Sequence, residues 1–269
     1  MSRQTVHDAA CQALMATELA EKQSLLDTLS HAWDADELLA NPELGVAGPV
    51  PRPGRPERPL LVHPRELKQR KLFSPGGHAA FLHALAHIEF NAINLALDAV
   101  YRFHGLPGAY YSGWIQVARE EVYHHQLLVE HLENQGYGYG DFPAHNGLWD
   151  MAMRTDSDLL LRMALIPRVF EARGLDVTPP MIERLRQYGD ERGAEILEII
   201  LHDEVGHVAI GNRWYHWVCE RRGLEPQETF IQLVREYLPG RVKGPFHVEA
   251  RLKAGFSEQE LRQLENLEY

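Results

Sequence analysis

The chain has 269 residues, of which 45% are hydrophobic, and a formal net charge of −11. This size allows one substantial core, and the acidic balance argues against nucleic acid as a partner on electrostatic grounds. The two cysteines, Cys11 and Cys219, exclude a disulfide framework and a Cys-x-x-Cys metal site. No signal peptide and no run of roughly 20 apolar residues is found, so we expect a cytoplasmic protein with no membrane partner.

Residues 1–71 predict a helical segment followed by a proline-rich arm. Helical periodicity covers residues 5 to about 40. Seven prolines then lie between Pro42 and Pro64, and proline fixes φ and removes a donor, which predicts an extended surface arm. The arm and its end, Arg52–Lys71, hold a basic cluster: Arg52, Arg55, Arg58, Arg65, Lys68, Arg70 and Lys71. This cluster indicates either a solvated arm that pairs with acidic surface or a dock for an anionic substrate or partner.

Residues 72–223 predict four long helices that pack as a bundle. The first begins at Ser74-Pro75, a favourable cap and first-turn pair, and runs to about His104. The other three cover about 112–135, 155–173 and 190–222, and a glycine follows each. Pro167 should kink the third helix. A short helical piece is expected at 180–188.

Residues 224–269 predict a helical extension that belongs to the same globular unit. One helix should follow Pro226, and another should follow Ser257, where Ser-Glu-Gln-Glu matches a capping box. The expected fold class is therefore all-α, with the N-terminal segment, the arm and the C-terminal helices added to a four-helix bundle.

Two of the long helices contain the same pair of metal-ligating residue types. Glu121 and His124 lie three residues apart in the second helix, and Glu204 and His207 repeat this spacing in the fourth. Residues three apart share one face of a helix, and here that face is otherwise apolar. One Glu-x-x-His is a weak signal, but two on the inward faces of long helices predict a common site.

The other two long helices each contain one glutamate on an apolar face. These are Glu89 in the first helix and Glu171 in the third. Four buried carboxylates repel one another and lose their hydration. Two divalent cations would balance the four charges, and two neutral histidines would complete the ligand set. One Glu from each of two helices plus Glu-x-x-His from the other two is the arrangement of ferritin-like di-iron and di-manganese bundles.

Other histidines are expected outside this site. His83 and His87 are four residues apart, but their helix face continues with Asn91, Asn94 and Asp98. This is a polar face, which predicts that both histidines are solvated rather than ligands.

The residue before each motif glutamate is acidic, as Glu120 and Asp203 show. This resembles the acidic-Glu-x-Arg-His signature of the di-iron carboxylate superfamily. The resemblance implies that Asp203 orients His124 and that Glu120 orients His207, as outer hydrogen-bond partners do at metal sites. The chain departs from the signature where Arg is replaced by Tyr123 and Gly206.

Three longer stretches, HALAHIEFNAINLALDAVYRF, EARGLDVTP and DEVGHVAIGNRW, are similar to a bacterial ferritin-like family, domain of unknown function 455. The likeness covers the chain from about Pro64 to its C-terminus. It implies an antiparallel ferritin-like four-helix bundle and a metal site, and it supplies no substrate.

The residues therefore predict a di-metal protein with two Fe ions, or with Mn/Fe or Mn/Mn. The first functional hypothesis is an oxidoreductase or hydroxylase that uses O₂, an external reductant and an unknown small-molecule or anionic substrate. The alternatives are a ferroxidase or iron-handling protein and a non-catalytic, metal-stabilised helical module. A homodimer is compatible with all three. The segments added to the bundle favour the oxidoreductase, because iron storage needs little besides four helices.

Overall fold

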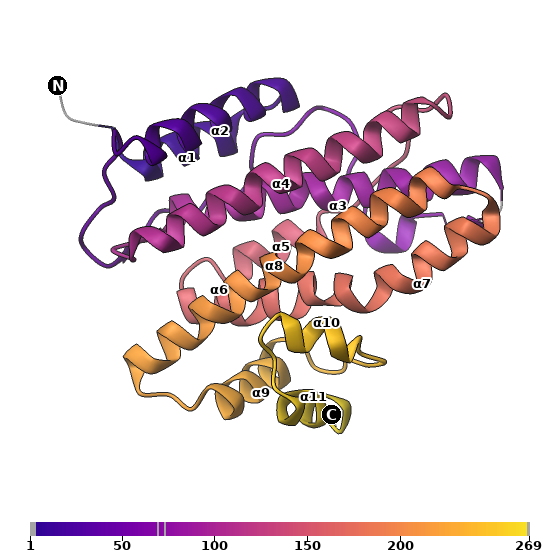
Figure 1. Cartoon of the computed structure of the whole chain (residues 1–269). Coiled ribbons are helices and arrows are strands. Elements are labelled where there is room, and N and C mark those ends of the chain that lie inside the picture. The colour runs from indigo at the N-terminus through magenta and orange to yellow at the C-terminus, as the bar shows by residue number, and fades with distance from the viewer. Residues whose placement is uncertain (1–3, 69, 73, 268–269) are drawn as a thin grey trace. The chain divides into compact units, whose positions relative to one another are not determined.

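The computed structural model describes residues 4–68, 70–72 and 74–267. These residues form an all-α fold with one short two-stranded ribbon (Figure 1), which confirms the expected fold class. The chain divides into two compact units, Met1–Arg154 and Thr155–Tyr269. The three segments proposed from the sequence, 1–71, 72–223 and 224–269, stay a prediction.

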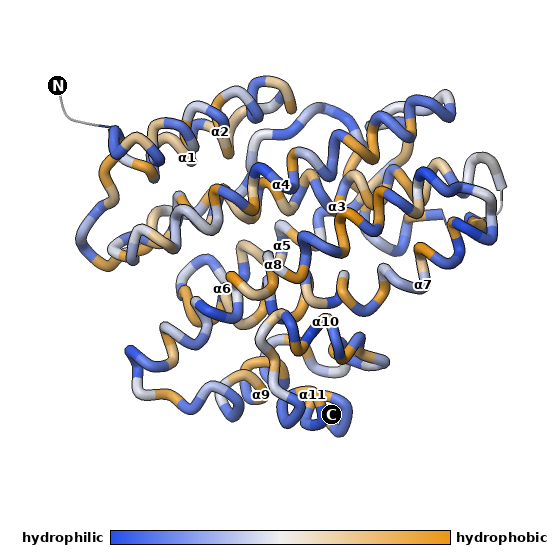
Figure 2. The backbone as a smooth tube through the Cα atoms, in the orientation of Figure 1, coloured by the Kyte–Doolittle hydropathy of each residue, from blue (hydrophilic) through white to orange (hydrophobic). Residues whose placement is uncertain are grey.

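The first unit is built around a hairpin of two long helices, α3 (Pro75–Arg102) and α4 (Gly108–Glu133). Ser74 caps α3 by accepting a hydrogen bond from the N–H of Gly77, as the sequence predicted. The remaining helical elements of this unit are α1 (Val6–Met15), α2 (Leu19–Asp34), the 3₁₀ turn η1 (Pro64–Glu66) and α5 (Gly147–Arg154). Along α4 apolar and polar residues alternate (Figure 2), as expected for a helix with one buried face.

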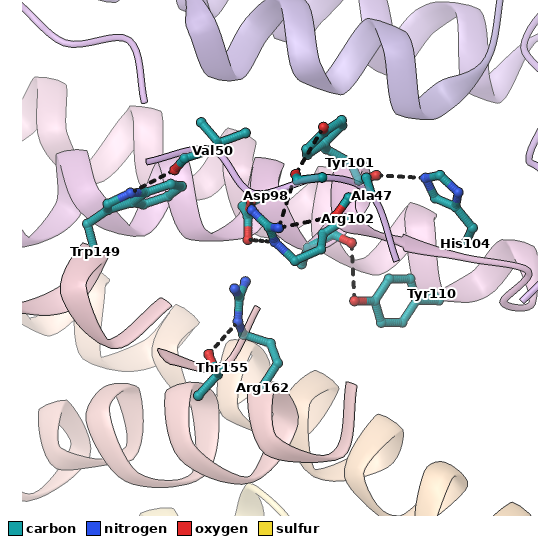
Figure 3. Close-up of polar contacts among 12 residues, drawn as sticks. Ala47, Val50, Asp98, Tyr101, Arg102, His104, Tyr110, Trp149, Thr155 and Arg162 are labelled. Atoms are coloured by element: carbon teal, nitrogen blue, oxygen red, sulfur yellow. Dashed lines mark hydrogen bonds and ion pairs between the residues drawn. The ribbon is translucent and has the colours of Figure 1, made fainter. Parts of the chain in front are cut away.

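The proline-rich arm follows the surface of the first unit and is fixed by backbone hydrogen bonds. Its strand β1 (Gly45–Val46) pairs with β2 (Phe103–His104), directly after α3. A buried ion pair supports this contact: Arg102 binds Asp98 at 2.6 Å and donates from Nη1 to the carbonyl of Gly48 (Figure 3). The indole N–H of Trp149 donates to Val50 farther along the arm. The arm is extended, as predicted, and its backbone is anchored.

The polar face of α3 is buried, so the prediction that His83 and His87 are solvated is wrong. Their exposed fractions are 1% and 8%. The loop after α4 covers them: the N–H of Gly140 donates to His83 Nε2, and the Tyr139 hydroxyl lies 2.9 Å from His87 Nδ1. Helical periodicity cannot reveal that a distant loop returns across a polar face and supplies its hydrogen bonds.

Helix α3 also passes the length and hydropathy criteria for a membrane span. Residues 76–102 form the apolar stretch, and 78% of its most apolar 18-residue segment is buried inside the structure. This degree of burial is typical of a core helix in a soluble protein. A cytoplasmic location stays a prediction.

The second unit is built around α7 (Ala172–Tyr188) and α8 (Glu191–Arg222), which are joined by a turn at Gly189. Asp190 caps α8 with its side chain. The helix ends before Gly223, as the sequence predicted, and this glycine is in the left-handed conformation. Its other helices are α6 (Leu159–Leu165), α9 (Pro226–Tyr237), α10 (Val248–Lys253) and α11 (Glu258–Glu265).

The third helix differs from its prediction in both length and continuity. It does not stop at Gly174, because α7 continues to Tyr188 with Pro179 and Pro180 inside it. The helix predicted at 180–188 is the end of this element. Packing along α8 stabilises α7 even though the two prolines remove N–H donors.

A π-helix, η2 (Ile166–Glu171), connects α6 to α7. It contains Pro167, at which the sequence predicted a break, because proline lacks the N–H that an α-helical turn requires. Gly211 of α8 faces this ring, and a Cβ atom at that position would overlap with Pro167. The glycine therefore allows α8 to approach the widened helix.

The C-terminal helices are attached to η2 through one buried cation. Arg168 is fully buried, and its guanidinium lies 4.1 Å from the ring centre of Phe230 and 4.8 Å from that of Phe256. It also forms an ion pair with Glu260, which belongs to the Ser257 capping box that the sequence predicted. A charge-assisted hydrogen bond and ring stacking thus hold α9 and α11 against η2.

We expect Gly211→Ala to lower the free energy of unfolding by about 1–3 kcal/mol, because the new methyl group overlaps with a rigid ring. Gly174→Ala is the matched control, since no atom of the residues that the structure describes lies within 4 Å of a Cβ there. It should stabilise α7 by about 0.5–1 kcal/mol. Urea unfolding measures both changes, and equal stability of the two variants would contradict the close approach.

Acid should destabilise the first unit through its buried histidines. Burial lowers the pKa of His83, His87 and His125 to about 4. Because the unfolded chain has its histidine pKa near 6.5, the stabilising contribution is complete above that pH and is lost as the pH falls towards 4. The slope reaches up to about 1.4 kcal/mol per pH unit for each histidine.

Between about pH 7 and pH 4.5, the free energy of unfolding of His83→Gln, measured in urea, should fall less steeply than that of the unchanged protein. The difference should equal the contribution of one histidine. His31→Gln is the control, because His31 is exposed on α2. An unchanged slope in His83→Gln would show that folding does not lower the pKa of His83.

Candidate metal centre

The first unit brings together three of the residues that the sequence selected. Glu89 lies on α3, and Glu121 and His124 lie on the facing side of α4. Their exposed fractions are 5%, 0% and 0%. The prediction that these polar side chains occupy an apolar helix face is confirmed.

The three side chains form one compact donor set. The Nδ1 atom of His124 lies 3.4 Å from Oε2 of Glu89 and 3.5 Å from Oε2 of Glu121. One ligand atom from each of the three lies within 4.8 Å of the others, so a single metal ion can contact all three. Two carboxylates and one imidazole are ligand types that divalent metal ions accept.

The electrostatics of this cluster favour a bound cation. Burial and the neighbouring carboxylate of Glu121 raise the pKa of Glu89 well above its ordinary value. Burial disfavours the charged form of His124, but its contacts with Glu121 and Glu89 outweigh burial and raise the pKa of the imidazole. Because the pKa of His124 is raised to about 11, the metal-free imidazole holds a second proton at neutral pH, and a divalent cation would replace it.

The second unit places the other predicted ligands on two elements that pack together. Glu204 and His207 lie on α8, with Glu204 Oε2 at 3.8 Å from His207 Nδ1. Glu171 is the last residue of η2, and η2 packs against α8. One carboxylate oxygen of Glu171 and one of Glu204 are buried from solvent. The second unit therefore contributes two carboxylates and one imidazole as well.

The two residues predicted to orient the histidines are half-buried. Glu120 accepts a hydrogen bond from Gln116, one turn earlier on α4, at 2.6 Å. Asp203 lies on α8 next to Glu204. Their assignment to His207 and His124 stays a prediction.

The sequence patterns gave no prediction for the buried arginines of the second unit, Arg162, Arg168 and Arg251. Arg162 donates to Thr155 (Figure 3), Arg168 binds Glu260, and Arg251 binds Asp176. An arginine in a mostly apolar helix was the available signal, since arginine is rarely buried unless it is paired.

The fold and the cluster together define a helical protein with a candidate carboxylate–histidine metal site. The chain belongs to the family described as "Protein of unknown function (DUF455)", whose model matches residues 15–262. An uncharacterized protein of Haemophilus influenzae is 50% identical over 213 residues, which cover 77% of this chain and 74% of that protein. No solved structure matches. Membership of this family was implied by the sequence stretches quoted above and is confirmed.

Replacing Glu89 by Gln should stabilise the metal-free protein and remove its response to metal. A carboxyl group with a raised pKa makes the folded state less stable as the pH rises past the unfolded value, and the neutral amide lacks this effect. We therefore expect Glu89→Gln to have a higher free energy of unfolding than the unchanged protein near pH 8, and a smaller difference at acidic pH.

Thermal unfolding with and without Fe²⁺ or Mn²⁺ measures both effects. The unchanged protein should melt at a higher temperature with metal, whereas Glu89→Gln should show little increase. Glu130→Gln, an exposed position on α4, should behave like the unchanged protein. A metal-induced rise that survives in Glu89→Gln would exclude Glu89 as a ligand.

Proposed function

We propose that the chain is a ferritin-like di-metal protein, and that it is an oxidoreductase which uses O₂ to oxidise or hydroxylate a small organic substrate. The observation that carries the proposal is the buried cluster of Glu89, Glu121 and His124. A core that surrounds two carboxylates and one imidazole with apolar helix faces is suited to holding a cation.

The proposed centre combines this cluster with the ligands of the second unit, Glu171, Glu204 and His207. Together they supply four carboxylates and two imidazoles, whose four negative charges balance two divalent cations. The order along the chain also supports the combination, because a glutamate helix precedes a Glu-x-x-His helix in each unit. Iron is the proposed metal, and manganese is accepted by the same ligand types.

Two reduced iron ions, when bound, would supply electrons for the reduction of O₂, and an external reductant would restore them. The protein's own contribution is to hold the ligands in place and to keep water out. The carboxylates provide negative charge that stabilises a cationic centre, and the histidines bind as neutral imidazoles. Asp203 and Glu120 would accept the second ring N–H of His124 and His207 and so fix their orientation.

An oxidoreductase is favoured over iron storage because of the structure outside the long helices. The arm is anchored along the first unit, and the C-terminal helices are attached to η2 through Arg168. Neither addition is needed to oxidise and store Fe²⁺, whereas an enzyme that binds an organic substrate needs surfaces around its centre. The substrate is proposed only as a small molecule, with no nucleic acid or membrane partner.

Metal analysis of protein expressed with iron and manganese tests the centre. We expect two ions per chain, and we expect Glu204→Ala to lose at least one because a carboxylate ligand is removed. Glu195→Ala is the control: it lies on the same helix, is exposed and pairs with Arg192. Full metal content in Glu204→Ala would contradict the proposed ligand set.

Oxygen uptake by the iron-loaded, reduced protein tests the reaction. Uptake should stop after a few turnovers unless a substrate and a reductant are supplied. Sustained oxidation of many Fe²⁺ ions per chain would favour a ferroxidase. A fully loaded protein that does not react with O₂ would favour a metal-stabilised module without catalytic activity.

Asp203→Ala should weaken metal affinity or activity by about 10- to 100-fold without unfolding the chain, as expected for a group that orients a ligand histidine. Asp203→Asn, which keeps a hydrogen-bond acceptor, should recover part of the loss. Metal titration and circular dichroism separate affinity from folding. If neither Asp203→Ala nor Glu120→Ala changes the affinity, the proposed outer hydrogen bonds are wrong.

A further inference from the structure

The second unit contains a cavity of about 170 Å³ that is separate from the residues of the candidate metal centre. Its walls come from η2, the start of α7 and residues 238–251. Apolar side chains such as Phe170 and Phe246 form part of the lining. The charged side chains of the lining are all cations: Arg173, Arg241, Lys243 and Arg251.

Arg251 is the buried cation of the lining: it is 2% exposed, and only part of its guanidinium forms hydrogen bonds within the protein. Its Nε and Nη2 atoms donate to the two carboxylate oxygens of Asp176 at 2.9 and 2.7 Å, and Nη2 also donates to the carbonyl of Ala172. Its Nη1 atom is buried and has no hydrogen-bond partner among the described residues. A buried donor without a partner is costly, and the residue that carries it lines the cavity.

The cations that line the cavity make it attractive to an anion. Asp176 is the carboxylate that contacts this group: it binds Arg251, and Arg173 lies 3.5 Å from it. Among the described residues, this is the one carboxylate with which the four cations of the lining have ion pairs, in a chain whose net charge is −11. Arg173 is also held in place, since it donates to the carbonyl of Lys243 at 3.2 Å.

We propose that this cavity binds a small oxyanion, a carboxylate or a phosphate monoester, carried on a short apolar group. The guanidinium groups suit the planar or tetrahedral oxygens of such an anion, and the phenylalanines suit the apolar part. The volume exceeds that of one water, about 30 Å³, several-fold. It is smaller than the roughly 300 Å³ at which pockets for drug-sized ligands begin, so the occupant is a fragment-sized molecule.

The proposed anion site does not depend on the proposed metal centre, although residues of the two sites are adjacent in the sequence. Val169 and Phe170 line the cavity and directly precede Glu171. Binding of the anion needs neither metal nor O₂, so the two proposals can fail separately.

Isothermal titration calorimetry on the full-length chain tests the site with benzoate, phenyl phosphate, inorganic phosphate and benzamide. Benzoate or phenyl phosphate should bind saturably at one site per chain. Benzamide, the neutral isostere of benzoate, should bind at least about tenfold more weakly, because hydrogen bonds to charged groups are the stronger ones. The aromatic acid that binds more tightly identifies the headgroup as a carboxylate or a phosphate. If inorganic phosphate binds but neither aromatic acid does, the proposal that the ligand has an apolar group is wrong.

Two exposed cations allow a variant that should fold. The double variant Arg241→Gln, Lys243→Gln should weaken binding of the preferred anion at least about tenfold. Lys253→Gln is the matched control, since Lys253 is exposed on α10 and pairs with Glu249. Equal binding of benzoate and benzamide, unchanged affinity in the double variant, an equal loss in Lys253→Gln, or no saturable binding of any anion would overturn the proposal.

Discussion

Removing a carboxylate from water costs several kcal/mol unless a cation or a set of hydrogen bonds replaces the lost hydration. The protein meets this constraint in two ways. Asp98, Asp176 and Glu260 each lie against a buried arginine, which neutralises the charge permanently. Glu89 and Glu121 instead lie against each other and against His124, an imidazole that can give up its proton. A cluster whose protons can be exchanged for a metal ion differs in this respect from a fixed ion pair.

The buried arginine pairs also explain how the added segments are attached. Arg102, which is paired with Asp98, donates a hydrogen bond to the carbonyl of Gly48 and so fixes the arm on the first unit. In the second unit, Arg168 connects η2 to α11 through Glu260, and Arg251 connects α10 to α7 through Asp176. In each case the arginine binds a group that is far away in the sequence. The positions of the arm and of the C-terminal helices therefore depend on tertiary contacts rather than on their own helix propensity.

The π-helix is the element at which these features meet in the second unit. Pro167 prevents a regular α-helical turn, and Gly211 leaves room for the proline ring on α8. The same six residues contain Arg168, two apolar residues of the cavity lining, Val169 and Phe170, and Glu171. π-Helical turns are frequent at functional sites, because the extra residue redirects the side chains that follow it.

The all-α class and the caps at Ser74 and Ser257 could be predicted from the sequence, because periodicity and capping depend on neighbouring residues. The same periodicity selected Glu89, Glu121 and His124, which the structure brings together. The long third helix depended on tertiary structure: packing along α8 keeps α7 helical through Pro179 and Pro180. The burial of His83 and His87 also depended on it, since a loop more than fifty residues away supplies their hydrogen bonds. A periodic pattern shows which side chains share a helix face, but only the folded chain decides whether water or another segment covers that face.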